Sequence, residues 1–101
     1  MDTVAVPHLA VATASEAIAH VNRWLHRDVG MAVHATAAHF EATTFCWHVP
    51  LELAYATHGT LGVVGDVYLH AATGTFVGRP SAADIIQRAE RLAAACGIDG
   101  C

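Results

Sequence analysis

Six polar or reactive side chains of the segment 45–78 can share one surface, because strand side chains alternate between two faces. The segment reads FCWHVPLELAYATHGTLGVVGDVYLHAATGTFVG and predicts two long strands joined by a loop, then a tight turn and a short return strand. If the two strands pair, one face of the sheet carries Cys46, His48, Glu52, Asp66, Tyr68 and His70. Such groups can bind a metal ion, catalyse a reaction or contact a partner.

Metal binding is the first chemistry to consider. His34, His48 and His70 are the expected ligands, because imidazoles on adjacent strands lie about 5 Å apart and can meet one divalent transition metal ion. The chain has no HxxxH spacing and no CxxC pair, and its eight histidines are spread along its length. Scattered histidines favour a surface or an interface, so we expect no cofactor and keep the metal site as an alternative.

Catalysis is the second chemistry. Cys46 and His48 share a face, and Glu52 or Asp66 can orient the imidazole. A thiol nucleophile also needs donors for the oxyanion, and no glycine-rich turn or helix start lies beside Cys46 in the sequence. A pair of His48 or His70 with a carboxylate lies opposite the predicted core, where only another subunit can enclose it. We therefore expect a non-catalytic protein and keep a small enzyme as the alternative.

The opposite face of the same strands is apolar and predicts the core. Its members are Phe45, Trp47, Val49, Leu51 and Leu53 in the first strand, and Val63, Gly65, Val67 and Leu69 in the second. An antiparallel sheet that buries one face needs helices to cover that face. The rest of the chain supplies two.

Both helices have recognisable starts. Thr13-x-x-Glu16 is a capping box, and apolar residues at helical spacing follow as far as Gly30, which predicts a helix over about 14–29. Ser81-x-x-Asp84 begins a second helix, which ends at Gly97.

The expected strands are 31–37, 40–55, 63–70 and 75–77. A bulge is expected near Thr43–Thr44, because the phase of the apolar residues changes there. Pro50 cannot donate to a strand ladder and is expected at an edge, a bulge or a strand break. The connections are too short for parallel crossovers. The fold class is therefore α+β, a two-layer sandwich of an N-terminal helix, a three- or four-stranded antiparallel sheet and a C-terminal helix.

Length and charge restrict the possible partners. The 101 residues predict one domain over 13–97, with an N-terminal arm (1–12) and a C-terminal tail (98–101). Five arginines, no lysine and a net charge of −4 leave no basic surface for phosphates, so we expect no nucleic acid and no membrane as partner. Three widely spaced cysteines form no disulfide framework, which favours a reduced, cytoplasmic protein.

The polar face of the predicted sheet also resembles an interface. It mixes Pro50, Val64 and Tyr68 with histidines and few charges, and interface centres are poor in charge and rich in aromatic residues. We expect a homo-oligomer that associates through the sheet, with a further protein partner possible.

One turn carries a resemblance to known families. The segment 65–76, GDVYLHAATGTF, resembles the strand–turn–strand pattern G-x-V-x-V-D-A-x-T-G-x-V of PepSY-like domains, with His70 in place of the usual Asp. A Trp-containing strand, a glycine-rich loop and this hairpin are also similar to small immunity-type proteins of bacterial polymorphic toxin systems. These families are non-catalytic binding or inhibitory modules, so the resemblance implies an interaction protein.

Overall fold

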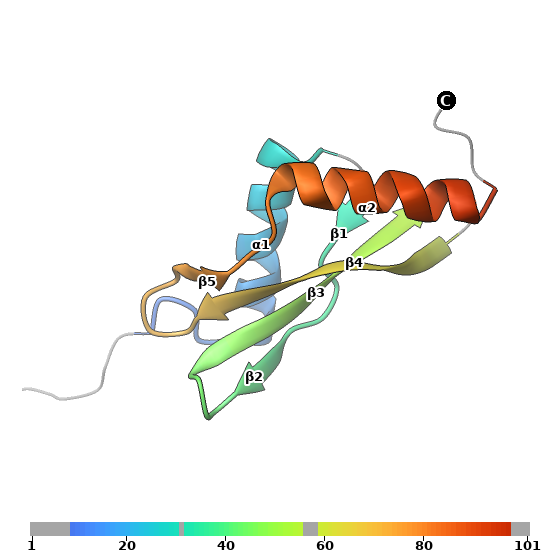
Figure 1. Ribbon diagram of the computed structural model, residues 1–101. Helices are drawn as coiled ribbons and strands as arrows, with labels where there is room; N and C mark the ends of the chain where they lie inside the picture. The colour runs from blue at the N-terminus through green and yellow to red at the C-terminus, as the bar shows by residue number, and fades with distance from the viewer. Residues whose placement is uncertain (1–8, 31, 56–58, 98–101) are drawn as a thin grey trace, which may run out of the picture.

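The computed structural model describes residues 9–30, 32–55 and 59–97 and has a small α+β fold. Two helices pack against one five-stranded antiparallel sheet (Figure 1), which confirms the predicted fold class with one strand more than expected. The elements are α1 (Ala14–Asp28), β1 (Val33–His34), β2 (His39–Glu41), β3 (Cys46–Tyr55), β4 (Gly59–His70), β5 (Phe76–Gly78) and α2 (Ala82–Ala95). Most of the arm 1–12, the tail 98–101 and the connection 56–58 between β3 and β4 lie outside the described residues.

Both helices begin as their sequences predict. The Thr13 hydroxyl accepts the Glu16 N–H at 3.1 Å, and the Glu16 carboxylate accepts the Thr13 N–H, which completes a capping box. Ser81 accepts the Asp84 N–H at 3.1 Å and starts α2. Within the described part of the chain, no helix is long and apolar enough to cross a membrane.

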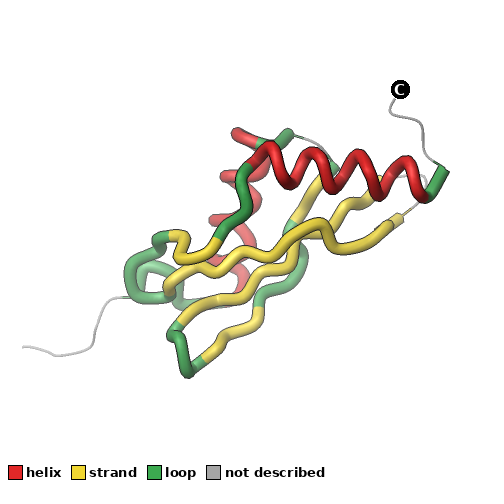
Figure 2. Tube along the Cα trace, viewed as in Figure 1, coloured by secondary structure: helices red, strands yellow, loops and turns green. Residues whose placement is uncertain are grey.

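The long hairpin of β3 and β4 is the centre of the sheet (Figure 2). β5 pairs with the end of β4, and β1 and β2 both pair with the other edge of β3. The gap between β1 and β2 lies opposite Pro50, which has no N–H to offer a partner strand. The strand expected over 31–37 is short, because the side chain of Asn22 in α1 forms hydrogen bonds with both backbone groups of Ala35. Asn22 accepts the Ala35 N–H at 2.8 Å and donates to the Ala35 carbonyl at 3.0 Å.

The bulge expected near Thr43–Thr44 is wrong, because the chain reverses direction there. β2 and β3 pair antiparallel across this turn, with Glu41 opposite Cys46. Phe45 ends the turn with a φ of 56°, a left-handed conformation that is uncommon outside glycine. Its side chain is 39% exposed, so the prediction that Phe45 belongs to the core is also wrong.

A β-bulge lies in β4 instead. The register shifts between Leu51 and Glu52, where Leu51 pairs with Gly65 and Glu52 pairs with Val63. The extra residue, Val64, is buried, while Val63 is 57% exposed. The sequence predicted the opposite orientation for these two valines, because strict alternation does not anticipate an inserted residue.

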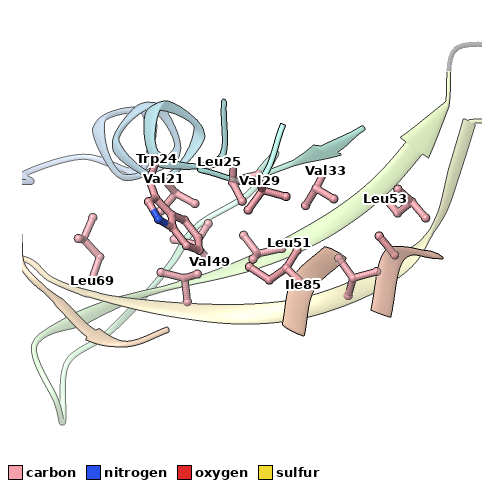
Figure 3. Packing of buried hydrophobic residues seen from close by; sticks show 14 of the residues in the cluster. Val21, Trp24, Leu25, Val29, Val33, Val49, Leu51, Leu53, Leu69 and Ile85 are labelled. Atoms are coloured by element: carbon pink, nitrogen blue, oxygen red, sulfur yellow. The ribbon is translucent and has the colours of Figure 1, made fainter. Parts of the chain in front are cut away.

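The core lies between the helices and one face of the sheet (Figure 3). α1 contributes Ala17, Val21, Trp24 and Leu25, and α2 contributes Ile85, Ala89 and Ala93. Val49, Leu51 and Leu53 of β3 are fully buried, as predicted. Trp47 is half-buried and donates its ring N–H to the carbonyl of Val11 at 3.0 Å.

α2 approaches β4 closely because β4 has a glycine at the contact. A Cβ on Gly65 would lie 3.3 Å from Cγ of Pro80 and 3.5 Å from Cδ1 of Leu51, with Ile85 also within reach. Leu51 therefore lies where the sheet meets α2, and Figure 3 shows it between side chains of the two helices.

Truncating Leu51 tests this packing. Leu51→Ala removes a fully buried side chain from between the two layers, so we expect the free energy of unfolding to fall by about 2–5 kcal/mol. Urea denaturation measures the change. Val63→Ala, in the same hairpin but exposed, is the matched control and should cost less than about 1 kcal/mol. Equal losses in both variants would contradict the placement of the core.

The surroundings of His20 in α1 lower its pKa. Its ring packs edge-on against Phe76, with 5.6 Å between the centroids. Burial lowers the pKa of His20 below its ordinary value, and the Arg23 guanidinium nearby lowers it further. The unfolded chain therefore binds a proton at this histidine more readily than the folded chain does.

This displacement makes stability depend on pH. Above about pH 6.5 His20 does not reduce the free energy of unfolding. As the pH falls below that value, the unfolded chain binds a proton at His20 more readily than the folded chain, and the free energy of unfolding decreases. We expect His20→Gln to lose less stability than the wild type between about pH 7 and pH 5. Urea denaturation at several pH values measures the slope, and His26→Gln in the same helix should keep the wild-type slope. An unchanged slope in His20→Gln would assign the effect to other groups.

Candidate functional site

The face of the sheet that the helices leave uncovered carries all six predicted side chains. Directly opposed residues share a face, and the register pairs Cys46 with His70, His48 with Tyr68, and Pro50 with Asp66. Glu52 lies farther along the same side of β3, between His34 and Val63. We call this surface the outer face; its side chains are His34, His39, Glu41, Cys46, His48, Pro50, Glu52, Val63, Asp66, Tyr68 and His70.

A histidine–aspartate pair lies near the middle of the outer face. Nε2 of His48 is 2.8 Å from Oδ1 of Asp66 on the neighbouring strand. The His48 ring also stacks on the ring of Tyr68, with centroids 4.9 Å apart and planes 12° from parallel. The two hydrogen-bonded side chains are 26% and 50% exposed, so they are accessible to a partner.

The other three predicted residues, Cys46, His70 and Glu52, form hydrogen bonds with neighbouring groups. The Cys46 thiol is buried and donates to the carbonyl of Thr44 at 3.3 Å. Nδ1 of His70 accepts the N–H of Ala72 at 3.2 Å in the following turn. Glu52 accepts the hydroxyl of Thr36 at 3.2 Å.

These contacts restrict the chemistry available to Cys46. A nucleophilic cysteine transfers its proton to a base within hydrogen-bonding distance. The Cys46 thiol instead donates to a backbone carbonyl, and His48 is bonded to Asp66. The arrangement therefore differs from that of an activated thiol.

The three expected metal ligands are distributed along the face. His34 lies opposite Glu52, and His48 lies four residues from Glu52 along β3, which corresponds to about 13 Å. His70 lies at the far end, opposite Cys46. Among residues 9–30, 32–55 and 59–97, no three His, Cys, Asp or Glu side chains are grouped so that they could hold a metal ion.

Sequence reasoning missed the part of the outer face that β2 contributes. His39 pairs with His48, with ring centroids 6.3 Å apart, and Glu41 pairs with Cys46. The expected strand 40–55 runs through Glu41 without a reversal and leaves His39 outside any strand, because the sequence predicts a bulge where the chain turns at residues 42–45. The change of phase between Phe40 and Phe45 was the signal, and a turn explains it as well as a bulge does.

An open hollow of about 230 Å³ lies where β2, β3, β4 and β5 meet. It is lined by Glu41, Thr44, Cys46, Tyr68, Val77 and Gly78. Val77 is 62% exposed, and the histidine–aspartate pair lies outside the lining. The hollow therefore offers a small apolar contact surface next to the polar pair.

The charges of the outer face are all of one sign when histidine is neutral. The carboxylates are Glu41, Glu52 and Asp66. The five arginines lie elsewhere, in α1, in α2 and in the linker that precedes α2. In that linker Arg79 lies over the rings of Trp24 and Phe76, at 4.7 and 4.5 Å from their centroids.

No protein-family model matches this chain, and neither a curated protein nor a solved structure matches it significantly.

The His48–Asp66 pair should contribute little to folding, because polar contacts between side chains that remain exposed to water are weak. We expect Asp66→Asn to change the free energy of unfolding by less than about 1 kcal/mol, measured by urea denaturation. Asn22→Ala is the comparison, because it removes two partly buried hydrogen bonds to Ala35 and should cost about 1–3 kcal/mol. A larger loss for Asp66→Asn than for Asn22→Ala would assign the pair a structural role.

Proposed function

We propose that this protein is a small, non-catalytic interaction module of the cytoplasm that binds protein through its outer face. A second copy of the chain is the proposed partner, and the bound state is a homo-oligomer joined through the sheet. The functional class that we propose for this module is inhibitory or immunity-like.

The observation that carries the proposal is the composition of the uncovered outer face. It spans β1 to β4 and carries no lysine, and rings of histidine and tyrosine occupy its centre. Interface centres are enriched in aromatic residues and depleted of lysine relative to the rest of a protein surface.

An exposed apolar residue beside the hollow adds to this support. Val77 is 62% exposed and borders the hollow next to Tyr68. Exposed apolar surface at a concave site favours burial against a partner. The free state of the two described cysteines, Cys46 and Cys96, is compatible with the reducing compartment that the proposal assumes.

Adding a charge beside the hollow tests the proposal. Val77→Glu introduces a carboxylate into the proposed contact, so we expect self-association to weaken by about tenfold. Sedimentation equilibrium over about 10–500 µM protein measures the dissociation constant of the oligomer. Gln87→Glu adds the same charge to the exposed side of α2 and should leave the constant unchanged. A wild-type protein that stays monomeric, or equal effects of the two variants, would contradict the proposal.

A further inference from the structure

The outer face combines carboxylates and histidines in nearly equal number and carries no arginine or lysine. Three carboxylates share it with four imidazoles, which are His34, His39, His48 and His70. With neutral histidines its formal charge is −3, and protonation of all four would bring it to +1. Its sign can therefore change over the range in which histidine titrates, about pH 5 to 8.

The acidic and imidazole groups are interspersed over the face. His34 lies opposite Glu52, His48 is bonded to Asp66, and His39 lies next to Glu41 on β2. Any partner surface that covers the outer face therefore meets both kinds of group within a short distance.

In a symmetric dimer the same patch of both chains forms the contact, so the outer face of one copy lies against the outer face of the other. When the histidines are neutral, each copy presents a face of formal charge −3, and two faces of like charge repel. When the histidines are protonated, each carboxylate can oppose an imidazolium. The face is then complementary in charge to itself.

Resting on the proposed function, we infer that two copies associate through their outer faces with uptake of protons by the outer-face histidines. The association strengthens as the pH falls from about 7.5 to about 6, because protons stabilise the state that binds more of them. A cationic partner on the same face would show the opposite dependence, since protonation would repel it.

None of the described groups around the outer face carries a permanent positive charge that could take the place of the bound protons. The groups that surround the four histidines are Glu41, Glu52, Asp66, Cys46, Tyr68 and, from α1, His26, whose ring centroid is 6.1 Å from that of His34. The guanidinium of Arg79 is engaged on the side of Trp24. Histidine protonation is therefore the available source of positive charge within the contact.

The test is sedimentation equilibrium of the full chain at about pH 7.5, 6.7 and 6.0 and constant ionic strength. One proton taken up per dimer raises the association constant about tenfold per pH unit. We therefore expect association to strengthen at least about tenfold between pH 7.5 and 6.0. The quadruple variant His34→Gln/His39→Gln/His48→Gln/His70→Gln should lose most of this dependence, and His20→Gln, whose ring packs on Phe76 on the helix-covered side of the sheet, should keep it. Circular dichroism confirms that each variant is folded.

The outcomes separate the inference from the function on which it rests. A wild-type dimer whose strength does not change with pH would overturn the proton linkage and leave the interaction module intact. A pH-dependent dimer whose dependence survives the quadruple variant would overturn the assignment to the outer face. A chain that is monomeric at every pH would overturn both proposals.

Discussion

Burial of one face of the β3–β4 hairpin is the constraint on which the other features depend. Val49, Leu51 and Leu53 are fully buried beneath helices that cover the sheet from one side. Because strand side chains alternate, the residues between them must point to the other side. The outer face is thus a consequence of the core: once the apolar residues of β3 pack against α1 and α2, Cys46, His48 and Glu52 have no other position.

Local irregularities then decide which further groups reach that face. The bulge at Val64 reverses the alternation of β4, so that Val63 lies outside while Asp66 and Tyr68 keep their places opposite Pro50 and His48. On the other edge of β3, Pro50 and the hydrogen bonds from Asn22 to Ala35 separate β1 from β2. The chain reversal that follows brings His39 and Glu41 beside His48 and Cys46. The polar surface is therefore wider than two strands alone would make it.

The features that could be predicted from the sequence are those set by local interactions. Thr13 and Glu16 form a capping box within four residues, and the alternation of residues 46–53 needs no knowledge of distant partners. The reversal at residues 42–45 was missed because it depends on Phe45 adopting a left-handed conformation, which its residue type disfavours. The bulge at Val64 was missed because it follows from packing: Gly65 must lie under Leu51 and Pro80, so the extra residue is placed before it.

His48 and Asp66 differ from the polar side chains that hold backbone groups of the fold in place. The capping side chains and Asn22 each satisfy backbone groups of the fold, whereas His48 and Asp66 bond to each other while partly exposed to water. Exposed pairs of this kind contribute little stability, because water competes for both partners and salt screens their attraction. Their attraction increases when a covering surface excludes water. The pair is therefore weak in the isolated chain. In the proposed association, exclusion of water strengthens the attraction within the pair, and the desolvation of both groups opposes it.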